Sequence, residues 1–299
     1  MDKYAEMKEK IVRGVQECLG DDYVVELTTV EKTNVTRTGL TIRSIDSNLA
    51  PTIYLEDWFQ RLEKGDSLTS VINQIAEFAL RESKKSINVT DLLSWEKQKE
   101  NVRLKVINFE LNKDGLLKNT PYVAFLDLAV IFYLDLEKTF PDATITIHHE
   151  QLKMWGITVE ELYEVAKENS LKYQKITISS MLDVLLGMVG EDKAEELLEA
   201  GSRLDDDGMY VISTSDKRFG AMAMLQTKVL EDFSRKIHSS FWIIPSSIHE
   251  LIAIPDTIGM NQDYLNQMIQ EVNANELSAD EVLNSHAYYF NSKTCAITF

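Results

Sequence analysis

Basic residues are absent from a long stretch near the end of this sequence. No lysine or arginine occurs between Lys236 and Lys293, whereas acids accumulate there. The whole chain has a formal net charge of −17. Because affinity for nucleic acids and anionic membranes rests mainly on lysine and arginine, we expect no nucleic-acid partner and no membrane partner. The charge fits simple solubility, and it also fits an acidic face that docks a basic protein partner or mimics nucleic acid.

Cysteine is scarce, and long apolar runs are missing. The two cysteines, Cys18 and Cys295, stand near opposite ends, which indicates buried free thiols in a reducing cytosol rather than a disulfide framework. The longest apolar stretch, 125–136, contains Asp127 and Asp135 and is shorter than the ~20 residues that span a bilayer. The N-terminal residues alternate acids and bases without an apolar segment, unlike a signal peptide. These features predict a cytoplasmic protein.

Glycine occurs twelve times but never in a cluster ahead of a helix. The sequence has no GxGxxG, GxxxxGK[ST] or GxSxG motif, so it lacks the usual signatures of dinucleotide binding, of P-loop phosphate binding and of the hydrolase elbow. A zinc-binding HExxH helix is also incomplete, because Ala253 stands where a second histidine would follow His249 and Glu250. We therefore predict no cofactor and no metal site.

Apolar periodicity predicts a mixture of helices and strands. Helical spacing is found over 4–19, 68–79, 225–237 and 265–272. Strand patterns are found over 23–30, 40–44, 52–55, 102–106, 122–136 and 209–214, with two strands meeting at 245–247 and a closing hairpin near the end. Capping boxes at Thr158 and Ser278 predict helix starts. We expect an α+β fold with largely antiparallel sheets and helices packed on at least one side, either as one domain or divided near residue 150 into 1–150 and 151–299.

The densest group of reactive side chains is Ser246-Ser247-Ile248-His249-Glu250. A hydroxyl, an imidazole and a carboxylate this close together suggest acid–base or nucleophilic chemistry. Alternate side chains of a strand share a face, so Ser247 and His249 would lie side by side while Glu250 points away. Ser247 and His249 are thus candidate catalytic residues of a small hydrolase-like enzyme whose acid comes from elsewhere in the fold. The alternative is a strand start with polar turn residues and one hydrogen-bonded histidine.

Three further groups are similar to known sites but differ in spacing. Adjacent histidines at 148–149 point to opposite faces of a strand and are not expected to share a metal. Residues 141–142 followed by Glu150 and Lys153 are similar to a metal-dependent nuclease motif, whose Glu and Lys lie two residues apart rather than three. The acids at 205–207 are consecutive, whereas a calcium loop alternates them. Structural or surface roles are expected for all three.

Four segments together resemble a known family. They are YLEDWFQRLEKGDSL (54–68), FLDLAVIFYLDLE (125–137), FWIIPSSIHELIAIPD (241–256) and NQMIQEVNANELSADEVLNSHAYYF (266–290). In order and over nearly the whole chain, they are similar to a domain-of-unknown-function family of Gram-positive gut anaerobes that is often found near mobile genetic elements. The resemblance implies a cytoplasmic protein and assigns no activity. The sequence favours a non-enzymatic interaction or regulatory protein over the hydrolase-like alternative.

Overall fold

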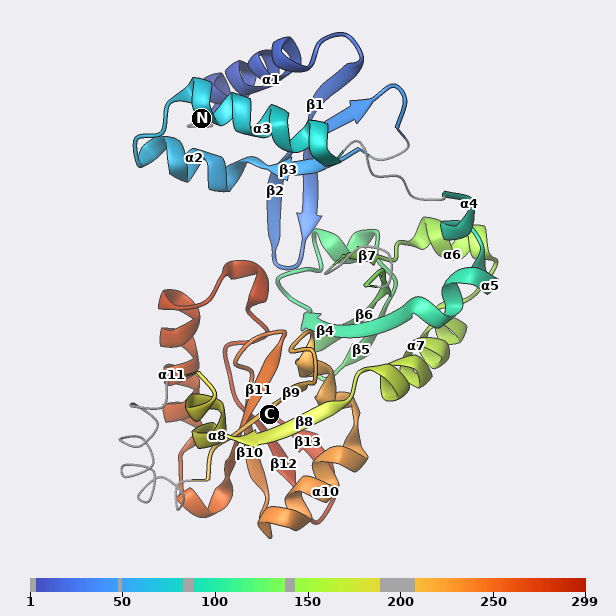
Figure 1. Cartoon of the computed structure of the whole chain (residues 1–299). Coiled ribbons are helices and arrows are strands. Elements are labelled where there is room, and N and C mark those ends of the chain that lie inside the picture. The colour runs from blue at the N-terminus through green and yellow to red at the C-terminus, as the bar shows by residue number, and fades with distance from the viewer. Residues whose placement is uncertain (1–3, 48–49, 83–88, 138–142, 189–207) are drawn as a thin grey trace. The chain divides into compact units, whose positions relative to one another are not determined.

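The structure is a computed structural model that describes residues 4–47, 50–82, 89–137, 143–188 and 208–299 (Figure 1). Its contacts divide the chain into two compact units, Met1–Ser94 and Trp95–Phe299. Every strand pairing in the described ranges is antiparallel, and helices pack against the sheets, which confirms the predicted α+β class. Residue 150, the expected boundary, lies inside helix α6 (His149–Trp155) of the second unit.

Unit 1 contains a three-stranded sheet on which three of its four described helices pack. Its strands are β1 (Tyr23–Lys32), β2 (Val35–Ser44) and β3 (Thr52–Tyr54), in the order β1-β2-β3. Cross-strand register places Val25 opposite Ile42 and Leu40 opposite Ile53, so these four buried side chains share one face of the sheet. They form one core with apolar side chains of the three helices, α1 (Ala5–Leu19), α2 (Leu55–Glu63) and α3 (Leu68–Glu82).

Unit 2 contains two antiparallel sheets. In the smaller sheet, β4 (Val102–Asn108) pairs with β6 (Leu128–Asp135), and β5 (Tyr122–Phe125) and β7 (Thr144–Thr146) also pair with β6. The larger sheet has the order β13-β12-β10-β11-β9-β8. Its strands are β8 (Ile176–Ser180), β9 (Tyr210–Thr214), β10 (Phe241–Ile244), β11 (Glu250–Pro255), β12 (Tyr288–Asn291) and β13 (Ala296–Thr298).

Helices cover parts of both sheets of unit 2. Helix α7 (Val159–Tyr173) packs against β4, and α11 (Gln262–Asn275) inserts Leu265 and Ile269 into a core with Ile244 and Ile254 of the larger sheet. The remaining described helices of the chain are α4 (Val89–Leu92), α5 (Trp95–Gln98), α6, α8 (Met181–Leu186) and α10 (Thr227–Ile237). The described 3₁₀ turns are η1 (Lys99–Asn101), η2 (Leu116–Lys118), η3 (Gly220–Leu225), η4 (Asp256–Ile258) and η5 (Ala279–Glu281).

The predicted elements are confirmed with three corrections. The capping box of Thr158 is present, since its hydroxyl accepts from the Glu161 N–H at 3.2 Å. Ser278, in contrast, precedes only the single 3₁₀ turn η5 and has no side-chain cap bond. Strand β4 is buried on both faces rather than half-buried. Both cysteines are free, but neither is buried as predicted: Cys18 is exposed and Cys295 is partly exposed.

Within the described residues, no helix has the length and apolar character needed to cross a membrane.

Candidate functional site

Ser247 and His249 lie in the turn between β10 and β11, and their side chains have separate partners. The Ser247 hydroxyl oxygen accepts a hydrogen bond from the backbone N–H of His249 at 3.0 Å. Nδ1 of His249 accepts from the backbone N–H of Phe219 at 3.2 Å, which places the proton of the neutral ring on Nε2. That nitrogen lies 4.0 Å from Oε1 of Glu281. An acid is therefore close to the histidine, but Nδ1 already accepts a backbone donor and is not available to take a proton from Ser247.

The surroundings of His249 keep its ring neutral and fixed. Burial lowers the pKa of the imidazole, the carboxylate of Glu281 acts in the opposite direction, and the cation of Lys105 lowers the pKa further. The ring stacks on Phe219 with centroids 5.2 Å apart, and the Lys105 ammonium lies 4.7 Å from the Phe219 centroid. Phe219 has a φ of 54°, a strained conformation for a bulky residue. The next residue must be glycine, because a Cβ on Gly220 would lie 2.3 Å from the His249 carbonyl oxygen.

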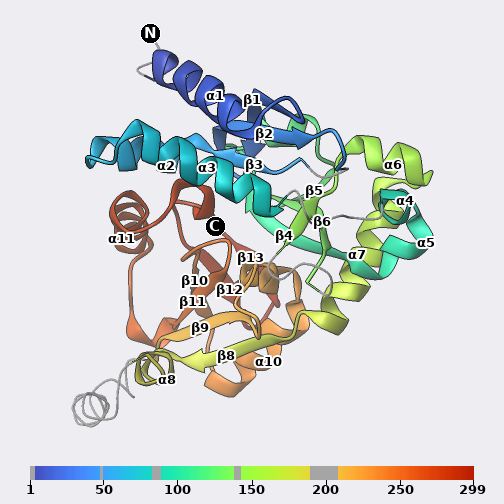
Figure 2. The same ribbon diagram turned by 45° about the horizontal axis from the view of Figure 1, so that its top comes forward.

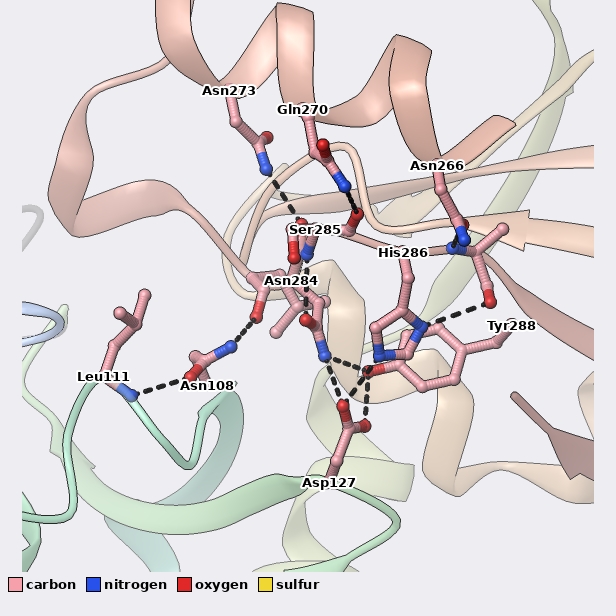
Figure 3. A network of polar contacts seen from close by, with 12 residues as sticks. Asn108, Leu111, Asp127, Asn266, Gln270, Asn273, Asn284, Ser285, His286 and Tyr288 are labelled. Atoms are coloured by element: carbon pink, nitrogen blue, oxygen red, sulfur yellow. Dashed lines mark hydrogen bonds and ion pairs between the residues drawn. The ribbon is translucent and has the colours of Figure 1, made fainter. Parts of the chain in front are cut away.

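A second polar cluster, centred on Asp127, joins the two sheets of unit 2 (Figure 3). Asp127 lies in the turn between β5 and β6. Its Oδ2 accepts from Nδ2 of Asn284 and from Nε2 of His286, and its Oδ1 accepts from the hydroxyl of Tyr288, each at 2.8 Å. Nδ2 of Asn284 also donates to the Tyr288 hydroxyl at 2.6 Å. Burial raises the pKa of Asp127, but the hydrogen bonds from His286, Tyr288 and Asn284 outweigh burial and hold the pKa below its ordinary value.

The segment 283–288, which we call the strap, is held by side chains from two directions (Figure 3). The strap ends on Tyr288, the first residue of β12, and its residues before Tyr288 are irregular, so side chains bond several of their backbone groups. From the smaller sheet, Nδ2 of Asn108 donates to the Leu283 carbonyl at 3.1 Å. From α11, three amide side chains bond the strap: Asn266 accepts from the Ala287 N–H at 2.8 Å, Asn273 donates to the Asn284 carbonyl at 2.9 Å, and Gln270 donates to the Ser285 carbonyl at 3.4 Å.

The ring of His286 has an acceptor opposite each nitrogen. Nε2 faces the Asp127 carboxylate, and Nδ1 lies 3.3 Å from the carbonyl oxygen of Ala287. The Phe299 ring stacks on the imidazole with centroids 5.3 Å apart. A general base needs a ring nitrogen whose lone pair is directed at the substrate. The Asp127 cluster is therefore suited to fixing the strap, and with it α11, on the smaller sheet.

The side of α11 that points away from the strap is acidic and carries exposed apolar groups. Helical spacing places Tyr264, Gln267 and Glu271 at its centre, with Asp263 and Val272 on its flanks, and we call these residues the α11 outer face. Tyr264 is 60% exposed and Val272 is 41% exposed. Gln267 donates to the Glu271 carboxylate at 2.9 Å, and the sequence has no lysine or arginine between Lys236 and Lys293.

The other predicted groups are separated or lie elsewhere. Nδ1 of His148 pairs with the Thr120 hydroxyl at 3.2 Å, whereas His149 is an exposed first residue of α6. Glu150 lies in the first turn of α6, as expected for an acid there. Residues 141–142 and 205–207 lie outside the described residues. In the described part of the chain, no three His, Cys, Asp or Glu side chains converge in a way that would hold a metal ion.

Comparison with known proteins places these two units in a family. The class defined by the fold is an α+β protein with antiparallel sheets. Residues 4–292 match a family of unknown function, DUF5688, and the chain belongs to this family, which confirms the predicted membership in a domain-of-unknown-function family. No curated protein and no solved structure matches the chain.

Proposed function

We propose that this protein is a cytoplasmic, non-enzymatic interaction protein whose α11 outer face binds a basic protein partner. The observation that carries the proposal is an exposed aromatic side chain, Tyr264, on a helix that has acids and no base. Exposed tyrosine is enriched at the energetic centres of protein interfaces. We also propose that the protein occurs in Gram-positive gut anaerobes and that its gene lies near mobile genetic elements.

The rigidity of α11 supports this role. Its inner side is fixed by Leu265 and Ile269 in the core and by three amide side chains on the strap. A partner that docks on the outer face therefore meets a surface that is already ordered, so little conformational entropy is lost on binding. The single sign of the surrounding charge speeds association with a basic partner and makes binding weaken as salt is added.

A basic amphipathic peptide provides the test. The probe is a helical peptide of leucine and lysine, titrated into the full chain at increasing salt and compared with the same peptide carrying glutamate in place of lysine. We expect binding of the lysine peptide only, and a loss of about tenfold or more in affinity on Tyr264→Ser and on Glu271→Lys. Equal binding by both variants and the parent chain would contradict the proposal.

Matched controls separate a local site from general charge attraction. Glu164 is exposed on α7, and Glu164→Lys changes the net charge by the same amount as Glu271→Lys. Leu171, 56% exposed on α7, gives the control Leu171→Ser for the Tyr264 variant. Both control variants should bind the lysine peptide as the parent chain does. If Glu164→Lys weakens binding as much as Glu271→Lys does, the attraction is diffuse and α11 is not the docking face.

The hydrolase-like alternative rests on Ser247 and His249, and one observation favours it. Glu281, from a distant part of unit 2, supplies an acid near the imidazole, 4.0 Å from Nε2. In that alternative the turn must rearrange, because Nδ1 has to release the Phe219 N–H before it can accept from Ser247. An activated aryl ester is a suitable probe. Equal hydrolysis by the parent chain and Ser247→Ala removes the alternative.

A further inference from the structure

Strand β1 of unit 1 is an edge strand whose outer side is only partly occupied. Its one strand partner in the described residues is β2. On the other side, the side chain of Gln16 takes the place of a neighbouring strand: Oε1 accepts from the Val25 N–H at 3.1 Å, and Nε2 donates to the Tyr23 carbonyl at 2.9 Å. A single glutamine thus satisfies the outward carbonyl of Tyr23 and the outward N–H of Val25.

The Gln16 bonds also show which backbone groups of β1 point outward. In an antiparallel pair, residues alternate between those bonded to the partner strand and those whose N–H and C=O groups point away from it. Since the backbone groups of Tyr23 and Val25 point away from β2, those of Leu27 and Thr29 do so as well. Within the part of the chain that the structure describes, their donors and acceptors form an unpaired edge that continues beyond the reach of Gln16. Such an edge is a template for another strand.

A groove lies beside this edge, between β1 and α1, which run side by side (Figure 2). It has a volume of about 400 Å³. Val12, Val25 and Leu27 provide its apolar lining, and Leu27 is 41% exposed there. Glu9, Arg13, Gln16 and Glu17, all from α1, complete the lining.

We propose that this groove binds an extended peptide segment of a partner protein, which adds to the sheet of unit 1 as a strand next to β1. Main-chain hydrogen bonds to Leu27 and Thr29 hold the segment, and its alternate side chains enter the groove against Val12 and Leu27. These side chains are apolar, because the lining that they meet is apolar.

The charges at the groove specify the partner further. Glu9 and Glu17 are exposed acids two turns apart on α1, and Arg13 on the turn between them is the one base of the lining. The excess of negative charge favours a lysine or arginine next to the apolar residues of the segment. The occupant is therefore an extended segment with alternating apolar residues and a flanking base. This second site is in unit 1, so it does not depend on the α11 outer face of unit 2.

The open edge of β1 can be tested in the protein without any peptide bound. In amide hydrogen exchange, the outward N–H groups of Leu27 and Thr29 should exchange faster than those of Thr28 and Val30, which bond β2. Equal protection of all four amides would show that the edge is not open, and would overturn the inference.

Binding is tested by panning a phage library of random peptides against the full chain. We expect enriched peptides with alternating apolar residues and a base, and a synthetic copy should slow exchange at Leu27 and Thr29. Leu27→Asp should weaken binding roughly tenfold or more, because it places a charge in the apolar groove. Thr29→Pro should do the same, because it removes an outward donor that β1–β2 pairing does not use.

Ile45, 66% exposed at the end of β2, supplies the control Ile45→Asp, which should bind as the parent chain does. Circular dichroism of each variant checks that the protein is folded. Leu27→Asp changes the apolar lining and Thr29→Pro removes a backbone donor, so either variant alone tests the inference if the other unfolds. The inference fails if no peptide is enriched, or if the enriched peptides bind the folded variants unchanged. It also fails if the chain forms dimers that Thr29→Pro dissociates, since the occupant is then a second copy.

Discussion

Replacing Asp127 with alanine should destabilise unit 2 by about 3 kcal/mol. The largest part comes from Tyr288, which is fully buried and would lose its charged acceptor. A hydrogen bond to a charged group contributes about 1.5–3 kcal/mol when its partner is left buried and unpaired. Asn284 keeps the Tyr288 hydroxyl as a hydrogen-bond partner, and the His286 side chain, 24% exposed, can bond water instead. These two residues therefore add less to the loss of stability.

Urea denaturation followed by tryptophan fluorescence measures this loss. Trp95, Trp155 and Trp242 lie in unit 2, whereas Trp58 alone reports on unit 1. With a denaturant dependence of about 2 kcal/mol per molar urea, the midpoint of the unit 2 transition should fall by roughly 1.5 M at unchanged slope.

Two further variants make the test specific to the Asp127 cluster. Asp114 is exposed before η2, and Asp114→Ala should change the free energy of unfolding by less than about 0.5 kcal/mol. Tyr288→Phe removes only the hydroxyl, so its effect and that of Asp127→Ala should be non-additive in a double-mutant cycle. A loss on Asp127→Ala no larger than that of Asp114→Ala, or full additivity with Tyr288→Phe, would refute the account of the cluster.

Three other changes should have measurable effects. Gly220→Ala should cost about 2–3 kcal/mol in thermal or urea unfolding, because its Cβ meets backbone atoms at 2.3 and 2.6 Å, whereas Gly187→Ala meets nothing nearer than 3.5 Å and should be neutral or slightly stabilising. Burial holds the pKa of His249 below its ordinary 6.5. As pH falls through 6.5, the unfolded state therefore binds a proton on His249 before the folded state does, so the stability that the neutral ring contributes is present above pH 6.5 and is lost below it. His249→Gln should therefore flatten the decline of stability between pH 7 and pH 5, and an unchanged decline would contradict this assignment. Thr158→Ala should lower stability by about 1 kcal/mol through the lost cap of α7, and helicity measured by circular dichroism should show the fraying.

Local patterns predicted the elements of this fold because each is coded within a few residues. The hairpin of β10 and β11 follows from two apolar runs around 245–247, and the cap of Thr158 follows from a glutamate three residues later. The same reasoning was wrong at Ser278. There Glu281 lies near the His249 ring, which is distant in sequence, and the chain continues as only one 3₁₀ turn.

Burial of charge was not predictable in the same way. The alternation of Val102, Leu104 and Val106 indicates one apolar face, and the intervening Arg103 and Lys105 suggest a solvated one. In the structure both charged side chains are buried, with the Arg103 guanidinium 4.4 Å from the Tyr173 ring and Lys105 over Phe219. Aromatic faces from other elements replace part of the water around these cations, and no local pattern reports those faces.

The Asp127 cluster shows the same limit for the candidate site. In the sequence, Asp127 only interrupts an apolar run, and Asn284, His286 and Tyr288 follow 157 to 161 positions later. The alternating polar residues before β12 are the one local signal of a polar cluster, and they do not indicate that Asp127 is their partner. Ser247 and His249 were conspicuous because they are neighbours in sequence, yet their hydrogen bonds go to backbone groups.

The distance along the chain between Asp127 and the strap has a consequence for synthesis. At ~5–20 residues per second, a ribosome delivers Tyr288 roughly ten to thirty seconds after Asp127. Until then the β5–β6 turn has none of the donors that the strap supplies, although the strands β4, β5 and β7 that pair with β6 are already synthesised. Unit 1, whose core residues all precede Ser94, is complete long before. In that interval the nascent chain already holds every core residue of unit 1, whereas Asp127 of unit 2 still lacks the hydrogen-bond donors of the strap.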